Sequence, residues 1–376
     1  MQVQLLIALR AIDSVGFQSG TRGLKNTIAL SRSFMETSHQ PVMLREVLSL
    51  AEQAYENYRS MNEESHPFRI LDGTLGAGGH SLELARAYSE ASMLMGDRDA
   101  RMLERARSNF AAAGLDPAQS RFNWMRKRAS EIELPLAGSA ENPPFAGLDF
   151  ALLDLGISML HLKEFKGGFS YEDESLDMRL DEDLQSSAQD LVNSLPEKEL
   201  ADLIYRYGEE RASRKIAHRI VQSRPVESAT RLAEIIARAI PGPRNRPHPA
   251  RKTFQALRIA VNDELAEAER AARHLSSLLN PGGILAIITF HSLEDRIIKK
   301  CFADLCGAGP GISRYDVPVL EQEQKPAAFE KAIRKSMAPS AEELEKNLAS
   351  RSARLRAIRR KNNAPGIEKR RAGISK

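Results

Sequence analysis

The chain has 376 residues, of which 42% are hydrophobic and 28% charged, and its formal net charge is +4. These values are typical of a globular protein long enough for two domains, and no apolar run approaches the roughly 18 residues that span a bilayer, so we expect no membrane partner. The two cysteines, Cys301 and Cys306, exclude a disulfide framework, and no Cys/His cluster has zinc spacing, which predicts a reducing compartment and no metal.

The first 34 residues differ from the rest in composition. They are rich in Ser, contain the single acid Asp13, and carry four basic residues, namely Arg10, Arg22, Lys25 and Arg32. This pattern is typical of a mitochondrial transit peptide. The alternative is an upstream extension before a natural start at Met35, and in either case we exclude residues 1–34 from the fold. We expect a cytoplasmic protein, or one of the mitochondrial matrix if the segment is a transit peptide.

A nucleotide-binding unit is predicted at residues 69–88. Two apolar residues lead to Asp72, a glycine-rich turn follows, and a helix is expected from Ser81. Glycines allow positive φ angles and bring backbone N–H groups close to a ligand, while a helix N-terminus favours a negative group. Taken alone, the pattern fits a plain turn as well as a ligand site. The glycines of the turn are Gly73, Gly76, Gly78 and Gly79.

Acidic residues end three of the predicted strands. The first strand ends at Asp72, the run Ala91–Gly96 is followed by Asp97 about 25 residues later, and Phe150–Leu153 is followed by Asp154. In an open α/β sheet the carboxyl ends of parallel strands border one crevice, where the second acid normally binds the ribose hydroxyls of a nucleotide. The alternatives are a solvated acid at Asp97 and helix capping at Asp154. The agreement of three strands favours one shared site.

The middle of the chain has a different pattern from its flanks. A third strand at Arg121–Arg126 and a loop at Pro135–Gly147 are predicted before it. From about residue 160 to 250 only helical periodicity is found, which predicts an all-α domain, residues 161–249, inserted into the sheet. The helices are expected at Ser38–Ala51, Leu103–Ala113, Ser187–Leu195, Glu197–Tyr207, Glu209–Gln222 and Thr230–Ala239.

The sheet pattern then returns, so residues 35–160 and 250–335 are assigned to one sheet domain. One long helix is predicted over Thr253–Leu279, followed by a strand at Ile284–Phe290, a helix after His291 and a late strand around Lys331–Lys335.

The C-terminal segment, residues 340–376, is predicted to be a basic tail. From Arg351 to Lys376 there are ten Lys and Arg residues against one acid, Glu368. Such a segment is typically unstructured, and its usual partner is a polyanion such as RNA, although an inert tail is the alternative.

Two ligands fit the first unit, a dinucleotide and S-adenosylmethionine. The dinucleotide fingerprint G-x-G-x-x-G is incomplete, because Ser81 stands where the third glycine is required. Asp72 before the turn would repel a phosphate but can accept a hydrogen bond from the ammonium group of an amino acid. Gly156 after Asp154, and the Pro281-Gly-Gly turn before a late strand, are further marks of a methyltransferase sheet. We therefore favour S-adenosylmethionine.

A series of motifs, in the same order along the chain, resembles the family of ribosomal small-subunit RNA cytosine-N4 methyltransferases, called RsmH or MraW in bacteria and with a mitochondrial counterpart. The resemblance runs from about residue 39 to 358. The motifs are His39–Val47, Asp72–His80, Asp97–Asp99, Leu153–Gly156, Gly168–Ser170, Leu176–Arg179, Tyr207–Arg211, Lys252–Arg258, Thr289–Arg296 and Ser350–Arg356.

The resemblance implies a Rossmann-like class I methyltransferase sheet with an inserted all-α domain. It implies that the enzyme methylates the N4 amine of a decoding-centre cytidine, the C1402 equivalent, of 16S rRNA in the small ribosomal subunit. The implied cofactor is S-adenosyl-L-methionine, no metal is required, and a homodimer is left open. The residues implied to bind the cofactor are Asp72, Gly76, Gly78, Gly79, His80, Asp97, Arg128, Asp154 and His161.

Two of these positions depart from the family pattern. His161 stands where the family has a Gln that contacts the cofactor, within the changed stretch Ser158–Lys163, and Arg128 stands where an aromatic residue often packs near the adenine. We expect these departures to alter cofactor affinity or the geometry of the site.

The chemistry requires a proton acceptor beside the target amine. The lone pair of the cytosine amine is conjugated with the ring, so the site must extrude the base, accept a hydrogen bond from N4–H and align the lone pair with the methyl group. Asp154 is the candidate acceptor, although it could instead serve only the cofactor. His291 and Glu294 are expected to shape the cytosine site, with a purely structural role for His291 as the alternative.

The sequence is also compatible with other roles for three arginines and with two other functions. Arg179, Arg211 and Arg258 fit contacts to rRNA phosphate or internal ion pairs equally well. A non-catalytic RNA-binding or ribosome-assembly protein would keep the sheet without the activity, and the changed stretch at Ser158–Lys163 is the support for it. An NAD-dependent oxidoreductase would bind nicotinamide and transfer no methyl group.

Overall fold

The computed structural model describes residues 41–61, 66–134, 147–240, 248–307 and 327–363. The predictions for residues 1–34, for most of the loop Pro135–Gly147 and for the end of the chain beyond Asn363 lie outside these residues. Within the described ranges no helix is both long and apolar enough to cross a bilayer.

A seven-stranded sheet in the order β3-β2-β1-β4-β5-β7-β6 forms the centre of the fold. Strands β1 to β5 are parallel, and β7 is antiparallel to both of its neighbours. This arrangement confirms the predicted Rossmann-like α/β class, and it brings the carboxyl ends of β1, β2 and β4 to one edge. The strands are β1 Arg69–Asp72, β2 Ser92–Asp97, β3 Phe122–Arg126, β4 Leu148–Asp154, β5 Leu279–Thr289, β6 Phe329–Lys331 and β7 Arg354–Arg360.

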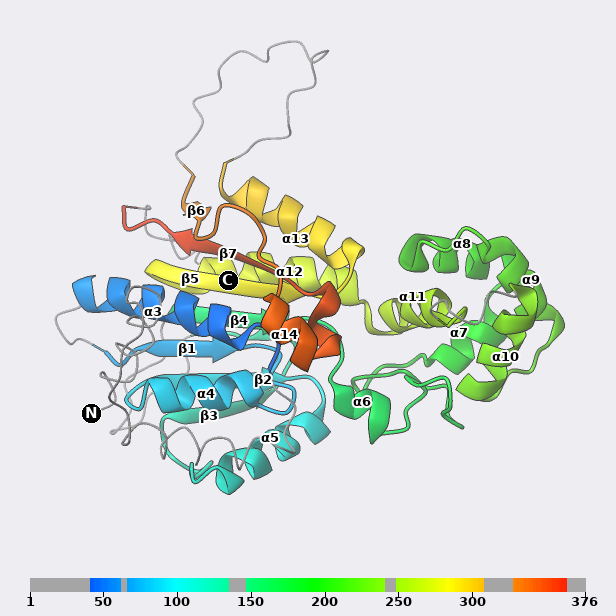
Figure 1. Ribbon diagram of the computed structural model, residues 1–376, viewed down its shortest axis with the longest axis horizontal. Coiled ribbons are helices and arrows are strands. Elements are labelled where there is room, and N and C mark those ends of the chain that lie inside the picture. Colours follow the sequence, from blue (N-terminus) through cyan, green and yellow to red (C-terminus); the bar gives the residue numbers. More distant parts are fainter. Residues whose placement is uncertain (1–40, 62–65, 135–146, 241–247, 308–326, 364–376) are drawn as a thin grey trace, which may run out of the picture.

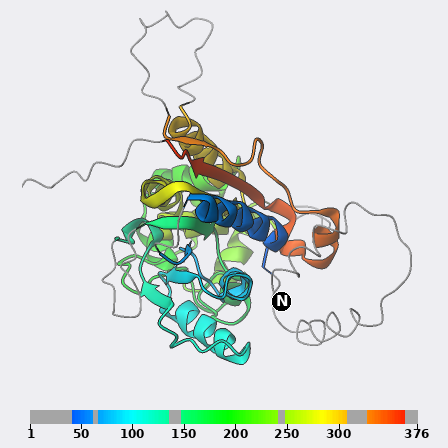
Figure 2. The same ribbon diagram turned by 90° about the vertical axis from the view of Figure 1, so that its left-hand side faces the viewer.

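Helices cover both faces of the sheet (Figures 1 and 2). Because successive side chains of a strand point to opposite faces, Ile70 of β1 packs into one apolar cluster and Leu71 into the other. A strand buried on both faces is rich in apolar residues, as β4 is from Phe150 to Leu153. One face is covered by α3 Leu44–Met61, α4 Gly79–Ala87 and α5 Ala100–Ala112, and the other by α12 Glu264–Leu278, α13 Ser292–Leu305 and the short turn η1 Ala129–Glu131.

The helical insert between β4 and β5 lies beside the sheet and has its own core (Figure 1). Leu200, Ile216 and Ile236 are fully buried there, and Phe254 and Leu257 pack against them. No strand occurs among the residues described between 159 and 262. The helices are α6 Met159–Lys163, α7 Ala188–Ser194, α8 Glu197–Gly208, α9 Ser213–Gln222, α10 Ala229–Ala239 and α11 Arg251–Asn262.

The prediction of one long helix over Thr253–Leu279 was wrong. The chain forms two helices, α11 and α12, which are separated at Asp263, where φ is +50°. Helix α11 packs into the insert and α12 onto the sheet, and a single straight helix could not serve both cores. Because α11 packs into the core of the insert, the insert extends beyond the predicted boundary at residue 249.

The prediction of an unstructured tail from residue 340 was also wrong for the residues that the structure describes. Arg354–Arg360 forms the internal strand β7, preceded by helix α14 Ala341–Lys346 and the turn η2 Leu348–Ser352. Leu355 and Ile358 are fully buried, while Arg356 forms two hydrogen bonds with the carboxylate of Asp295, at 2.8 and 2.9 Å. The late strand lies at Phe329–Lys331, slightly before its predicted position.

Candidate active site

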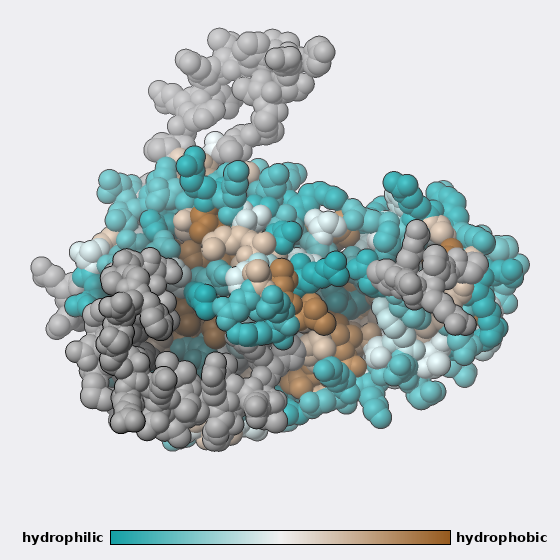
Figure 3. Space-filling view, in the orientation of Figure 1, coloured by the Kyte–Doolittle hydropathy of each residue, from teal (hydrophilic) through white to brown (hydrophobic). Residues whose placement is uncertain are grey.

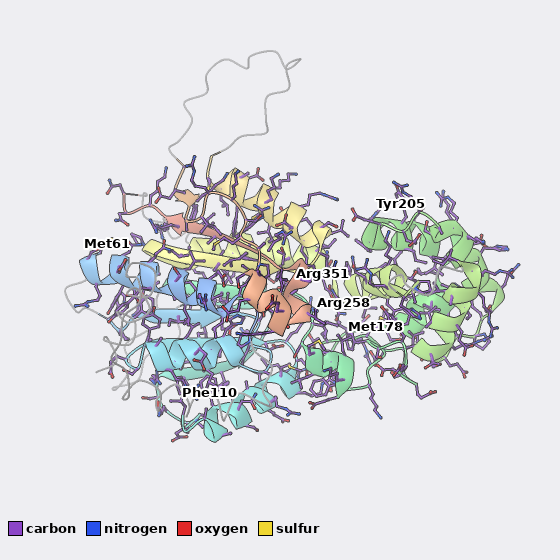
Figure 4. All side chains as sticks on the ribbon, viewed as in Figure 1. Met61, Phe110, Met178, Tyr205, Arg258 and Arg351 are labelled. Carbon is purple, nitrogen blue, oxygen red and sulfur yellow. The ribbon has the colours of Figure 1, made fainter. Side chains whose placement is uncertain are left out.

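A cavity of about 1790 Å³ lies outside the carboxyl ends of the parallel strands. Its walls come from the glycine turn after β1, the ends of β2 and β4, the insert and the C-terminal turn η2. Figure 3 shows apolar side chains gathered between the sheet and the insert, and Figure 4 places Met178, Arg258 and Arg351 at this junction. The predicted site residues on the cavity wall are Gly76, Gly78, Gly79, His80, Asp97, Arg128, Asp154, His161 and His291.

Asp72 is close to the site but does not line the cavity. It is buried beneath the glycine turn, where its carboxylate accepts hydrogen bonds from the Ser81 hydroxyl at 2.7 Å and the Thr74 N–H at 3.3 Å. Burial raises the pKa of Asp72 to about 6, against the effect of these two hydrogen bonds. Asp72 therefore orders the turn, and the wall carries the other two strand-end acids.

The glycine turn is fixed to the neighbouring strand. Gly78 has φ +80° at the start of α4, and a Cβ there would lie 3.0 Å from the Cβ of Ala106 in α5. Gly76 has φ +53°, and its N–H donates to Oδ2 of Asp97 at 2.8 Å. A Cβ on Gly76 would meet no protein atom within 4 Å. The positive φ angles, which other residues rarely adopt, turn the backbone along the cavity wall.

Asp97 ends β2 with both carboxylate oxygens engaged. Oδ2 accepts from Gly76, and Oδ1 accepts from the N–H of Asp99 at 2.9 Å. Burial raises the pKa of Asp97, while these N–H donors lower it. A carboxylate oxygen can accept more than one hydrogen bond, so hydroxyl groups of a ligand in the cavity can still bind here.

Asp154 and His80 face each other across 3.7 Å, measured from Oδ2 to Nδ1. Nε2 of His80 lies 2.9 Å from the carbonyl oxygen of Val42 and must carry the proton, so Nδ1 presents a lone pair. Burial lowers the pKa of His80 to about 4, which keeps the ring neutral. Two acceptors facing each other can hold an N–H group between them.

The carboxylate of Asp154 has unused hydrogen-bonding capacity. Its Oδ1 is buried and has no hydrogen-bond partner within the described part of the chain. Burial raises the pKa of Asp154 well above its usual value, and the negative charges of Asp72 and Glu294 raise it further. The backbone N–H of Asp154 donates to Oγ1 of Thr74 at 2.6 Å, which fixes its position. An unpartnered buried acceptor is costly unless a ligand satisfies it.

His161 uses both ring nitrogens within the protein. Nδ1 accepts the N–H of Ser158 at 3.1 Å, so Nε2 carries the proton, and Nε2 lies 3.0 Å from Oδ2 of Asp99. Burial raises the pKa of Asp99, but His161 and Arg101 outweigh that effect and hold the pKa below its usual value. The predicted cofactor contact of His161 stays a prediction, and any such contact would have to be made by ring carbons.

Two of the three arginines for which RNA contacts were considered, Arg179 and Arg258, form ion pairs within the protein. Arg258 forms a bidentate ion pair with Glu264, with its Nε at 2.9 Å and its Nη2 at 3.0 Å from the carboxylate oxygens. Arg179 likewise pairs with Asp177 at 2.7 Å. The internal ion pairs that were one of the two alternatives are thus present for these two arginines, whereas Arg211 is exposed. Arg128 lies 3.9 Å from Asp181, measured from Nη2 to Oδ2.

Glu264, His291 and Glu294 bring one ligand atom each within 4.8 Å of one another. Nδ1 of His291 accepts the N–H of Glu294 at 3.3 Å, so Nε2 carries the proton and cannot ligate a metal in this state. Nε2 lies 3.1 Å from Oε1 of Glu294, although not at a hydrogen-bonding angle. Glu264 is already held by the ion pair with Arg258, so the three side chains close this end of the cavity through contacts within the protein.

Sequence reasoning missed two supporting residues and the aromatic wall. Thr74 accepts a hydrogen bond from the backbone of Asp154, and Ser81 donates one to Asp72. Both lie within or next to the motif Asp72–His80, which could have indicated their roles. Tyr171 and Phe254 line the cavity from the insert, and nothing in their local pattern indicated this.

Comparison with known proteins identifies the family. The MraW methylase family matches residues 36–361. A protein of Treponema denticola named ribosomal RNA small subunit methyltransferase H is 41% identical over 335 residues, which cover 87% of this chain and 98% of that protein. The protein of the same name from Methylobacterium sp. (strain 4-46) is 39% identical over 337 residues, which cover 88% and 93%.

Two solved structures are similar at a lower level. The N-methyltransferase NodS from Bradyrhizobium japonicum WM9, in complex with S-adenosyl-L-homocysteine, has a TM-score of 0.35 and 10% identity, covering 88% of this chain and 96% of that one. An S-adenosylmethionine-dependent O-methyltransferase from Thermotoga maritima has a TM-score of 0.33 and 11% identity, covering 88% and 70%. From the family match and the two full-length relatives, the chain belongs to the MraW methylase family.

Proposed function

We propose that this protein is an S-adenosylmethionine-dependent methyltransferase of small-subunit rRNA, and that it methylates N4 of the decoding-centre cytidine equivalent to C1402 of 16S rRNA. The names of its relatives support an rRNA substrate of the small subunit. The observation that best supports the reaction is the buried Oδ1 of Asp154, at the end of β4. This oxygen has no hydrogen-bond partner in the described part of the chain. Its place of action would be the cytoplasm or the mitochondrial matrix, wherever small subunits are made.

The sheet side of the cavity suits S-adenosylmethionine. Asp97 would accept the ribose hydroxyls, and the backbone of Gly76 to Gly79 would lie against the amino-acid part. The planar guanidinium of Arg128 would stack on the adenine in place of an aromatic ring. S-adenosylmethionine supplies a methyl group that is already activated by its sulfonium, so the protein has only to position and deprotonate the amine.

Asp154 would perform that deprotonation. Its free Oδ1 accepts a hydrogen bond from N4–H, which turns the lone pair towards the methyl group, and the carboxylate takes the proton that the amine loses. Nδ1 of His80 lies 3.7 Å from the other carboxylate oxygen, Oδ2, and provides a second acceptor beside this carboxylate. The Nε2–H of His291 remains to donate to a carbonyl or ring nitrogen of the base.

Transfer of labelled methyl groups from S-adenosylmethionine to small-subunit RNA tests the proposal. Wild-type protein should label the RNA, nuclease mapping should find N4-methylcytidine at the decoding centre, and Asp154→Asn should lose the label while still binding the cofactor. Absence of transfer with intact RNA binding would instead favour a non-catalytic assembly protein. Binding of a nicotinamide dinucleotide without methyl transfer would favour an oxidoreductase.

A further inference from the structure

An aromatic platform lies on the insert side of the cavity, away from the strand-end acids. The ring of Tyr171 is stacked on that of His248, with centroids 4.3 Å apart and an angle of 17° between the planes. The ring of Phe254 meets Tyr171 edge-on at 4.9 Å and 80°. Tyr171 and Phe254 both line the cavity, and Tyr171 is half-buried. Two neighbouring rings therefore hold Tyr171 in one orientation.

A cation stands beside this platform. Arg251 also lines the cavity, and its positive charge acts on Tyr171, where it opposes the rise in pKa that burial causes. Two other arginines of the cavity wall form ion pairs, Arg105 with Glu164 and Arg258 with Glu264. In the described part of the chain no carboxylate oxygen lies within 4.0 Å of the guanidinium of Arg251. Its charge remains available for an anionic ligand.

The cavity is larger than the cofactor and one base require. Its volume of about 1790 Å³ exceeds the roughly 300–1,000 Å³ of a typical small-molecule site. The strand-end acids place the reaction against the sheet, so the remaining volume faces the insert. A base extruded from an RNA strand brings its neighbouring nucleotides to the same opening.

We propose that Tyr171 and Arg251 form a subsite for the nucleotide next to the methylated cytidine. Its base stacks on Tyr171, and its phosphate binds the guanidinium of Arg251. Stacking on a fixed ring is strong and tolerant of sequence, and an arginine matches phosphate geometry. The inference rests on the proposed function, because the ligand is its RNA substrate.

Binding of a small-subunit RNA fragment containing the target cytidine tests the subsite. Tyr171→Leu should weaken RNA binding by about 5- to 150-fold, whereas Tyr171→Phe, which keeps the ring, should bind within about twofold of wild type. The matched control is Tyr205→Leu, since Tyr205 is 61% exposed on the outer side of the insert and should not matter (Figure 4). The affinity for S-adenosylmethionine should stay unchanged in all three variants.

Arg251→Gln provides a second measurement, on a side chain that is exposed. The slope of log Kd against log salt should fall by about one. Tyr171→Leu binding RNA as tightly as Tyr205→Leu, or an unchanged salt slope in Arg251→Gln, would overturn the subsite. Failure of wild type to transfer methyl groups would overturn the proposed function instead, because the binding measurements do not depend on turnover.

Discussion

Nε2 of His161 lies 3.0 Å from Oδ2 of Asp99, and the same imidazole accepts the N–H of Ser158 through Nδ1. The ring thereby joins the loop after β4 to the start of α5, where Asp99 is the N-cap. Ser158 and His161 form a capping box at the start of α6, in which a Gln or Glu usually occupies the place of His161. A Gln amide could accept from Ser158 and donate to Asp99 as well. The predicted departure from the family at position 161 is therefore compatible with the same link.

Substitutions at His161 should separate this link from cofactor chemistry. We expect His161→Gln to leave the affinity for S-adenosylmethionine within about twofold and the free energy of unfolding within about 0.5 kcal/mol, because both hydrogen bonds can be rebuilt. His161→Leu should cost about 1–2 kcal/mol, since it removes the cap and one partner of buried Asp99. Calorimetric titration and urea unfolding measure the two quantities. A large loss of affinity in His161→Gln would show that the imidazole itself contacts the cofactor.

Asp154 should control the pH dependence of the reaction. Its carboxylate must be deprotonated to accept the amine proton, and burial together with Asp72 and Glu294 raises its pKa well above the usual value. We therefore expect kcat/KM to fall as the pH drops through this raised pKa and to reach a plateau above it. Asp154→Asn should lower kcat by about 100-fold or more and remove the pH dependence. An Asn variant that retains the wild-type pH profile would exclude Asp154 as the proton acceptor.

Asp72→Asn should stabilise the protein at neutral pH. Burial raises the pKa of Asp72 from 3.8 to about 6, so the folded state is penalised for its charge once the pH exceeds both values. The stability contributed by protonated Asp72 is present below about pH 4 and is lost as the pH rises through about 6. The gain from Asp72→Asn should thus grow from about 1 kcal/mol at pH 4.5 to at most about 3 kcal/mol at pH 8.

Urea unfolding at the two pH values checks this, and an equal effect at both would contradict it. The variant has a second effect, because the charge of Asp72 contributes to the raised pKa of Asp154. Its removal should shift the pH profile of methyl transfer towards lower pH, although Asp72 itself lies behind the cavity wall.

Local sequence predicted those parts of the site that depend on local geometry. A strand end fixes where its acid points, so Asp97 and Asp154 could be assigned to one crevice without knowledge of the packing. The position of Tyr171 at the cavity could not be predicted from local sequence, because the packing of the insert brings it there. The break at Asp263 was hidden for a similar reason, since each half of the helical pattern is regular but serves a different core. Strand β7 was not predicted because its many arginines indicated a basic tail, although Leu355 and Ala357 alternate with arginines as in a strand.

Alanine at two glycines of the turn should separate folding from cofactor binding. At Gly76 a Cβ meets no protein atom within 4 Å, so Gly76→Ala should cost about 1 kcal/mol for its positive φ. Since Gly76 lines the cavity, the methyl group should reduce cofactor affinity at least tenfold. Gly78→Ala has the same strain and also presses on Ala106 at 3.0 Å, so it should lose more stability. Thermal unfolding measures the stability of both variants, and titration measures their affinity for the cofactor. Equal losses of stability and of affinity in the two variants would contradict the prediction.

The two ends of the C-terminal segment should respond differently to truncation. Ending the chain after Ser352 removes β7, which pairs with β5 through Ile284–Thr289 and separates it from β6. The loss exposes the side chains of Leu355 and Ile358, which are fully buried, and leaves Asp295 without Arg356. Each buried aliphatic side chain contributes about 1.5–3 kcal/mol, so removing two of them takes away a large part of the 5–15 kcal/mol that stabilises a typical domain. We expect this truncation to abolish cooperative unfolding.

Ending the chain after Asn363 is the matched control. It keeps β7 complete, and the basic residues that it removes all follow this strand in the sequence. This shorter protein should unfold at the temperature of the full chain. Its affinity for RNA should weaken, and the salt dependence of binding should fall, if Lys369, Arg370 and Arg371 contact phosphates. Equal stability of both truncated proteins would show that β7 is dispensable, in conflict with its position inside the sheet.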